Sequence, residues 1–265
     1  MATEALDPAQ AFMAKISDRY KPVHDITARG TSSVQQFYCG ATVFLTGGSG
    51  FLGKQLIEKL LRATKVTKIY VLLRCKKDKS VQQRLVEMLK DPVDIIFHLA
   101  ATTRFDELLK QATFINIRGT REILALGKAS KKLSLIKGWP NTYTFTKAVA
   151  EGLVDTMGKD LPICVVRPAI VVCAIREPNP GWVDLSCIYG ASGYMYAVGL
   201  GVAHTAYGNH TNQVDVIPVD YVNNTILAAA WETARTKSST PQKDEIKIYT
   251  IASAFKNPIT WNSQI

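Results

Sequence analysis

The chain has 265 residues, of which 47% are hydrophobic and 20% charged, with a formal net charge of +10. The composition is that of a soluble globular protein, and the length suits one large α/β domain or one domain with an additional lobe. The basic balance favours anionic partners, either nucleic acid, an anionic membrane surface or phosphate-rich ligands. Because the Lys and Arg residues are scattered and no DNA-binding motif is present, we predict no nucleic-acid partner.

The cysteines and the apolar segments indicate an intracellular protein. None of the five cysteines forms a C-x-x-C pair or has metal-ligand spacing, which predicts reduced thiols and no metal site. The first residues include charged side chains and no apolar run, so no signal peptide is expected. The longest apolar stretch, residues 194–203, is too short to span a bilayer. Contact with a membrane would therefore need another segment or a partner.

The first half of the chain alternates between strand and helix patterns after a polar start. Residues 1–40 lack strong periodicity, which predicts a helical or irregular leader. Residues 41–46 (ATVFLT) form a short β-branched run that is typical of a buried strand. Residues 51–62 repeat apolar side chains at helical spacing. Residues 68–73 (KIYVLL) predict a second strand, and residues 80–90 predict an amphipathic helix.

The alternation continues along the chain. A strand is predicted at 93–98, a helix at 117–130, a helix at 142–157 and a strand at 161–167. Such alternation predicts βαβ units, and right-handed crossovers place helices on both faces of a parallel sheet. We therefore predict an α/β, Rossmann-type fold with a doubly wound parallel sheet in residues 41–170 and a small substrate lobe in residues 171–265. Small and aromatic residues at 189–207 leave two interpretations open: the lining of a substrate tunnel or ordinary packing of the lobe.

A glycine-rich turn joins the first predicted strand to the first predicted helix. The turn reads TGGSGFLG and contains both G-x-G-x-x-G and T-G-x-x-G-x-x-G. Without a Cβ in the way, the backbone can approach a pyrophosphate, and the helix N-terminus offers N–H groups to it. The strand before and the helix after make this a prediction of dinucleotide binding. The predicted contacts are Thr46, Gly47, Ser49, Gly50, Phe51, Leu52 and Gly53.

The residue after the second predicted strand indicates which nicotinamide dinucleotide is bound. An NAD site carries Asp or Glu at this distance past the glycines, where it holds the ribose hydroxyls. This chain has Arg74 there, followed by Lys76 and Lys77. A guanidinium suits a 2′-phosphate through paired charge-assisted hydrogen bonds. We therefore predict NADPH as the cofactor, although ordinary exposed charges after a strand would look the same.

A tyrosine and a lysine four residues apart form a candidate proton donor. Tyr143 and Lys147 read Y-x-x-x-K, and positions i and i+4 share one face of a helix. A nearby ammonium favours the phenolate and is expected to lower the pKa of the tyrosine. Such a tyrosine can deliver a proton to an oxygen that gains electrons from a hydride. The motif alone usually marks a surface pair, but its place behind a dinucleotide turn strengthens the catalytic interpretation.

Together these motifs resemble the short-chain dehydrogenases/reductases. HLAA at 98–101 and NIRGT at 116–120 are similar to the extended branch of that group. Longer stretches resemble the alcohol-forming fatty acyl-CoA reductases, and the resemblance runs from about residue 37 to the end of the chain. Those stretches are FYCGATVFLTGGSGFLGKQLIEKLL, VDIIFHLAATTRFDE, INIRGTREIL, KGWPNTYTFTKAVAEGLV, EPNPGWVD and IPVDYVNN.

The resemblance implies roles for individual residues. Gly47, Gly50 and Gly53 hold the pyrophosphate, and Arg74 holds the 2′-phosphate. Ala100 and Ala101 line the cofactor, and Asn116 supports the proton relay. Tyr143 is the general acid, and Lys147 binds the nicotinamide ribose and tunes Tyr143.

The resemblance also implies a reaction and a location. The family reduces a long-chain acyl-CoA to a primary alcohol with two NADPH, through an aldehyde, in lipid metabolism. It implies a protein at the cytoplasmic side of the endoplasmic reticulum or the peroxisome, with any membrane association made by parts outside this chain. Oligomeric state and acyl-chain length do not follow from it.

Two interior segments of the family pattern have no counterpart in this chain. The helix pattern that ends near Lys90 runs directly into VDIIFHLAA, where the family has another strand and helix. Near Leu133 the family has a buried strand that ends in a serine-containing turn, and the surroundings of Ser134 do not match it. We therefore expect a sheet that lacks one or two strands. This leaves two alternatives open: a catalytically impaired NADP-binding relative, or an extended reductase or epimerase acting on sterols or nucleotide sugars.

Overall fold

The computed structural model describes residues 30–72, 93–100, 113–121, 142–185, 188, 190–205, 207–239 and 246–261, together with scattered residues between 7 and 28. The helix predicted at 80–90 lies outside the described residues, as does most of the helix predicted at 117–130.

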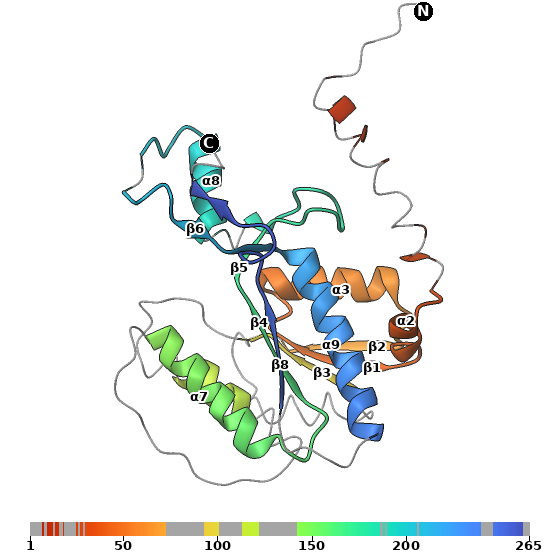
Figure 1. The fold of residues 1–265 in the computed structure, drawn as a ribbon. Helices are drawn as coiled ribbons and strands as arrows, with labels where there is room; N and C mark the ends of the chain where they lie inside the picture. Colours follow the sequence, from red (N-terminus) through yellow and green to blue (C-terminus); the bar gives the residue numbers. More distant parts are fainter. Residues whose placement is uncertain are drawn as a thin grey trace, which may run out of the picture.

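A parallel three-stranded sheet forms the centre of the first half (Figure 1). Its strands are β1 (Thr42–Thr46), β2 (Lys68–Leu72) and β3 (Ile95–His98), in the order β2-β1-β3. Four of the five β1 residues are buried, including side chains that point to opposite faces. A strand buried on both faces is typical of a parallel sheet covered by helices. The predicted α/β fold with a parallel sheet is confirmed.

Helix α3 (Phe51–Ala63) covers the sheet together with α9 (Val219–Ser239). Leu56 and Leu60 of α3 are fully buried, one turn apart, as the predicted apolar spacing requires. They join Val43 of β1 and Val222 of α9 in one hydrophobic core. The core therefore combines residues from both ends of the chain.

The end of the predicted leader belongs to this core. Helix α2 (Ser33–Phe37) begins with a capping box, in which the Ser32 hydroxyl and the Gln35 side chain each accept a backbone N–H of the other residue. The next residue, Tyr38, is fully buried, and its hydroxyl donates to the Leu227 carbonyl oxygen over 2.9 Å. Burial raises the pKa of Tyr38 far above its usual range. A five-residue helix is too short to show periodicity, so the sequence offered no local signal for this packing.

The core also extends across the predicted boundary at residue 170. Strand β4 (Cys164–Pro168) pairs in parallel with β8 (Lys247–Ile251), and β5 (Ile170–Val172) pairs in parallel with β7 (Val216–Pro218). In Figure 1 the β4–β8 pair runs between α7 (Thr142–Met157) and α9. The chain after residue 171 thus returns to pair with strands β4 and β5.

The described strands do not form one continuous sheet. On one side, β3 pairs with β1; on the other, β4 pairs with β8; and no strand in the described part of the chain joins β3 to β4. A strand between them would follow η1 (Thr113–Arg118), a π-helix, and precede α7. This is the position at which the sequence predicts a missing central strand.

A small lobe lies beyond the strands. It contains α8 (Gly190–Gly199) and an antiparallel pair, β6 (Gln213–Val214) with β9 (Ile259–Thr260). Tyr194 of α8 packs edge-on against Trp261, with ring centroids 6.0 Å apart. Several large apolar side chains of α8 are exposed, among them Met195 and Tyr196. Within the described residues, no helix has both the length and the apolar character needed to cross a membrane.

A loop at residues 174–184, which we call the clamp loop, packs against α3. Its Glu177 is 3% exposed, and its carboxylate contacts Lys59 and Arg62 of α3. Burial disfavours the Glu177 carboxylate, but the two cations outweigh that effect and lower its pKa. The carboxylate of Asp220 accepts the backbone N–H groups of residues 175–177 and shapes the loop.

Replacement of Glu177 by alanine is expected to lower the free energy of unfolding by about 3 kcal/mol, because it leaves the buried Lys59 ammonium without its carboxylate. Urea unfolding measures the loss. Glu58→Ala is the matched control: Glu58 pairs with Arg62 at a more exposed site, so its removal costs about 0.5 kcal/mol or less. Equal losses for the two variants would contradict the assigned role of the clamp loop.

Candidate cofactor and proton-transfer site

The glycine turn needs glycine for steric reasons at two positions. Gly47 has φ +77°, and a Cβ there would lie 2.8 Å from the Ala100 backbone nitrogen. A Cβ at Gly53 would lie 2.3 Å from the Gly47 carbonyl oxygen. The Gly50 N–H donates to that same oxygen over 3.0 Å and closes the turn. A tight strand-to-helix connection of this kind leaves the backbone open to a bound anion.

Helix α3 presents its N-terminus to this turn. Gly50 is the N-cap in extended conformation, without a side-chain cap hydrogen bond, and the first turn contains no acidic residue. No side chain of the helix's own first turn therefore offsets its partial positive charge at this end. Ser49 is exposed at the turn, and Phe51 and Leu52 are half-buried. The cradle fits the pyrophosphate of a dinucleotide.

The clamp loop reaches the same end of α3. Phe51 stacks on Trp182 with ring centroids 5.6 Å apart, and the Lys54 ammonium contacts the Asp184 carboxylate at 2.6 Å. These two contacts tie the beginning of α3 to the segment that leads into α8. The loop was not predicted as part of the site, since its partners are about 130 residues away in sequence.

The strand ends beside the cradle are joined by a histidine. Thr46 and His98 are partners in the β1–β3 register, and Thr46 Oγ1 lies 2.7 Å from His98 Nδ1. The Ala100 N–H donates to Thr46 Oγ1 over 3.3 Å. On the other side of the ring, His98 Nε2 lies 3.1 Å from Thr120 Oγ1. Thr46 and Ala100, two of the predicted cofactor contacts, are thus neighbours.

Asn116 connects this group to α7. It is 2% exposed, and its Nδ2 donates to Thr146 Oγ1 over 2.9 Å. Thr146 in turn donates to the Tyr143 backbone carbonyl over 3.1 Å. Asn116, predicted to support the proton relay, therefore holds the first turn of the helix that carries Tyr143.

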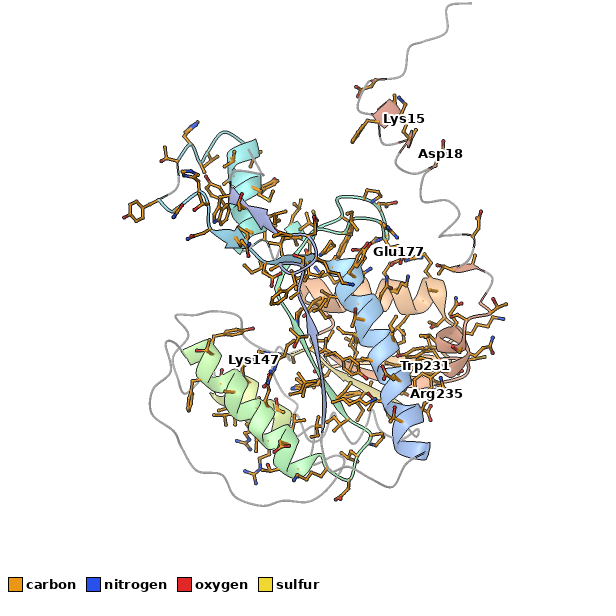
Figure 2. The ribbon with its side chains drawn as sticks, viewed as in Figure 1. Lys15, Asp18, Lys147, Glu177, Trp231 and Arg235 are labelled. Atoms are coloured by element: carbon orange, nitrogen blue, oxygen red, sulfur yellow. The ribbon has the colours of Figure 1, made fainter. Side chains whose placement is uncertain are left out.

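Tyr143 and Lys147 share one side of α7. Lys147 Nζ lies 5.7 Å from the centroid of the Tyr143 ring, and Figure 2 shows Lys147 on the face of α7 turned toward the strands. Burial raises the pKa of Tyr143 and lowers that of Lys147. The predicted lowering of the tyrosine pKa is therefore wrong for this structure, because desolvation of the phenol dominates. At neutral pH the phenol is protonated and can act as an acid.

His98 is neutral at this site. Burial lowers its pKa to about 4, with a further contribution from the positive charge of Lys147. The position of His98 directly before LAA was the signal that could have placed it beside the cofactor contacts, but its two hydroxyl partners, Thr46 and Thr120, lie 52 and 22 positions away in sequence.

Acidification is expected to destabilise the fold through His98. His98 takes up a proton near pH 6.5 in the unfolded chain and only near pH 4 in the folded chain. The contribution of neutral His98 to the free energy of unfolding is therefore complete above pH 6.5 and falls as the pH drops toward 4. The loss approaches about 3 kcal/mol at full titration. Urea unfolding between pH 7 and 4 measures it. A His98→Gln variant with the same slope would contradict the assignment.

Two predicted contacts, Arg74 and Ala101, lie outside the described residues. The preference for a 2′-phosphate therefore stays a prediction. Among the residues that the structure describes, no group of His, Cys, Asp or Glu is placed to hold a metal ion.

The fold and the site define a class of protein: an NAD(P)-binding Rossmann-type enzyme fold of the extended short-chain dehydrogenase/reductase group. WbmF of Bordetella bronchiseptica, solved with NAD+, is similar with a TM-score of 0.60 at 18% identity, over 86% of this chain and 77% of WbmF. The terminal R domain of the myxalamid PKS-NRPS pathway has a TM-score of 0.58 at 21% identity, and the match covers 91% of this chain and 75% of that domain. RMD of Pseudomonas aeruginosa, solved with NADPH, has a TM-score of 0.58 at 20% identity, and the match covers 84% of this chain and 80% of RMD.

The chain belongs to the male sterility protein family of NAD-binding domains, whose pattern matches residues 45–92, 86–137 and 129–226. Fatty acyl-CoA reductase wat of Drosophila melanogaster is 33% identical over 94% of this chain and 64% of the relative. Fatty acyl-CoA reductase 1 of Xenopus laevis is 31% identical over 86% of this chain and 61% of the relative. The chain thus spans less than two thirds of the length of these relatives.

The matches also locate the interior gaps. The three matched pieces of the family pattern meet at residues 86–92 and 129–137, the two places where the sequence predicts missing segments. The alignment with the Drosophila relative has 339 positions, whereas 94% of 265 residues is about 249, so roughly 90 positions have no counterpart in this chain. The second junction falls in the stretch between η1 and α7.

Proposed function

We propose that this chain binds NADPH and reduces a long-chain fatty acyl-CoA to the fatty alcohol through an aldehyde. One observation carries the proposal: the glycine turn and the Tyr143/Lys147 helix are joined by hydrogen bonds through His98, Thr120 and Asn116. The fatty acyl-CoA reductases among its relatives support the acyl-CoA substrate. The exposed apolar side chains of α8 would accommodate an acyl chain.

In this proposal each residue of the site has a role in cofactor binding or in proton transfer. Two NADPH, bound in turn, would supply one hydride each: the first would convert the thioester to the aldehyde with release of coenzyme A, and the second would convert the aldehyde to the alcohol. The turn from Gly47 to Gly53 holds the pyrophosphate, and Arg74 holds the 2′-phosphate. Tyr143, protonated because of its burial, donates the proton to the substrate oxygen. Lys147, with Nζ near the Tyr143 ring, replaces that proton and binds the ribose.

A second candidate function is cofactor binding without turnover. The junction between two matched pieces of the family pattern at residues 129–137 favours it, because the family's serine-containing turn is expected at that position. A serine donor that is absent would remove part of the stabilisation of the substrate oxygen, typically a hundredfold or more in rate.

The test uses the full chain with NADPH or NADH, and palmitoyl-CoA. Thermal unfolding reports cofactor binding, and a ligand at about 100 times its Kd adds roughly 2.7 kcal/mol. The proposal expects stabilisation by NADPH over NADH, loss of absorbance at the nicotinamide band, and hexadecanol as product. Stabilisation without turnover supports the second candidate. Turnover of sterols or nucleotide sugars, but not of palmitoyl-CoA, overturns both.

The location proposed for the protein is the cytoplasmic side of the endoplasmic reticulum or the peroxisome. A fluorescently tagged chain that co-localises with markers of either organelle supports this. Diffuse fluorescence throughout the cell contradicts it.

A further inference from the structure

The hydrogen bonds around His98 have only one consistent set of directions. At the α7 end, the Asn116 amide nitrogen can only donate, so Thr146 Oγ1 accepts from it. The single hydroxyl proton of Thr146 then goes to the Tyr143 carbonyl oxygen, which can only accept. This part of the network ends on the backbone of the residue proposed as the acid.

The same reasoning fixes the proton on the imidazole. Thr120 Oγ1 donates its only proton to the Asn116 carbonyl oxygen over 2.6 Å. Its contact with His98 Nε2 must therefore be donated by the ring, which places the ring proton on Nε2. In the neutral ring, Nδ1 is then an acceptor and receives the Thr46 hydroxyl proton over 2.7 Å. Thr46 Oγ1 still accepts the Ala100 N–H.

The resulting network runs in two directions from one ring. Through Nδ1 it reaches Thr46 and the glycine turn, and through Nε2 it reaches Thr120, Asn116 and α7. Asn116, Thr120 and Thr146 are each 7% exposed or less. A second proton on Nδ1 would require the Thr46 hydroxyl to turn and accept, and Lys147 adds a positive charge nearby. Protonation would therefore reverse the hydrogen bond at the Thr46 end of the network.

Within the described residues, two sets of contacts hold α7 to the cradle: its packing on η1 and this network. The packing side chains Ile117, Phe145 and Leu153 are apolar and fix no direction. The polar network supplies the orientation of the first turn of α7.

We infer that His98, as a neutral Nε2–H imidazole, is a positioning residue that sets the Tyr143/Lys147 helix relative to the cofactor cradle. It touches neither cofactor nor substrate in this role and acts through Thr46 and Asn116. The catalytic consequence rests on the proposed function, whereas the tautomer and the anchoring of α7 do not depend on turnover.

The first test is nitrogen-15 NMR of the histidine rings in the full chain at pH 6 to 7, with His98→Gln to assign the signals. The inference expects His98 with a protonated Nε2, an unprotonated Nδ1 and no imidazolium at pH 6. A protonated Nδ1, or an imidazolium at that pH, overturns it.

The second test is amide hydrogen exchange with His98→Leu, His98→Gln and Thr146→Val. Leucine removes both ring contacts, whereas glutamine keeps one acceptor and one donor. His98→Leu and Thr146→Val are expected to speed exchange in α7 about tenfold, with little change in α3, and His98→Gln restores protection. Uniform acceleration in α3 and α7, or no rescue by glutamine, shows a merely structural residue and overturns the inference.

Where the wild-type chain turns over, kinetics adds a third readout. His98→Leu is expected to lower kcat about tenfold and to leave the NADPH affinity within about threefold, since a displaced acid affects the chemical step. Unchanged kcat overturns the inference. If the wild type shows no turnover, the proposed function fails, while NMR and hydrogen exchange still decide the role of His98.

Discussion

Replacement of Gly53 by valine is expected to abolish stabilisation by NADPH and to lower the free energy of unfolding by about 3 kcal/mol. A Cβ at this position would lie 2.3 Å from the Gly47 carbonyl oxygen and 2.7 Å from the Gly48 Cα. Both are backbone atoms of the turn, so no side-chain rotation can relieve the overlap. The turn must open or α3 must withdraw from β1, and either movement removes the pyrophosphate cradle.

Gly152→Ala is the matched control for this prediction. Gly152 is an exposed position in α7, and a Cβ there meets no atom within 4 Å. Alanine is preferred over glycine in a helix interior, so this variant is expected to gain about 0.5–1 kcal/mol and to bind NADPH as the wild type does. Thermal unfolding with and without NADPH compares the two variants. NADPH binding that survives in Gly53→Val would contradict the assignment of the cofactor to this turn.

Tyr143→Phe is expected to lower acyl-CoA turnover about a hundredfold or more while NADPH binding stays nearly unchanged. The substitution removes only the phenolic hydroxyl, the proposed proton donor, and keeps the half-buried ring in place. Because burial raises the pKa of Tyr143, the hydroxyl carries its proton at neutral pH. Activity should therefore persist across neutral pH and decline only in alkaline solution.

The rates of NADPH oxidation for wild type, Tyr143→Phe and Tyr221→Phe decide this prediction. Tyr221 is 41% exposed on α9, so loss of its hydroxyl is expected to change kcat by less than about twofold. If Tyr143→Phe turns over like the wild type, another group donates the proton and the proposed role of the Y-x-x-x-K motif is lost. A fall in both variants would show a loss of folding and not the loss of a proton donor.

Local patterns in the sequence were sufficient for the elements nearest the site. The helix predicted at 142–157 is observed with those bounds, and the helix predicted at 51–62 is one residue longer. The three strands predicted at 41–46, 68–73 and 93–98 are observed with their ends shifted by one or two residues. Apolar spacing and β-branched runs carry this information within a single element, because each face of a helix or strand repeats with its own period. The glycine turn was predictable for the same reason.

What lies between elements was decided only by the tertiary structure. Tyr38 meets Leu227 across 189 positions, Glu177 meets Lys59 across 118, and His98 meets Thr46 across 52. No periodicity spans such separations, since the partners are brought together by the return of the chain to a shared core. The direction in which the pKa of Tyr143 shifts was missed for the same reason. The spacing in the sequence places an ammonium near Tyr143, but the burial that raises its pKa depends on the packing of the whole fold. The motifs, in contrast, depend on neighbours within one turn or one strand, and the order of residues is enough to specify those.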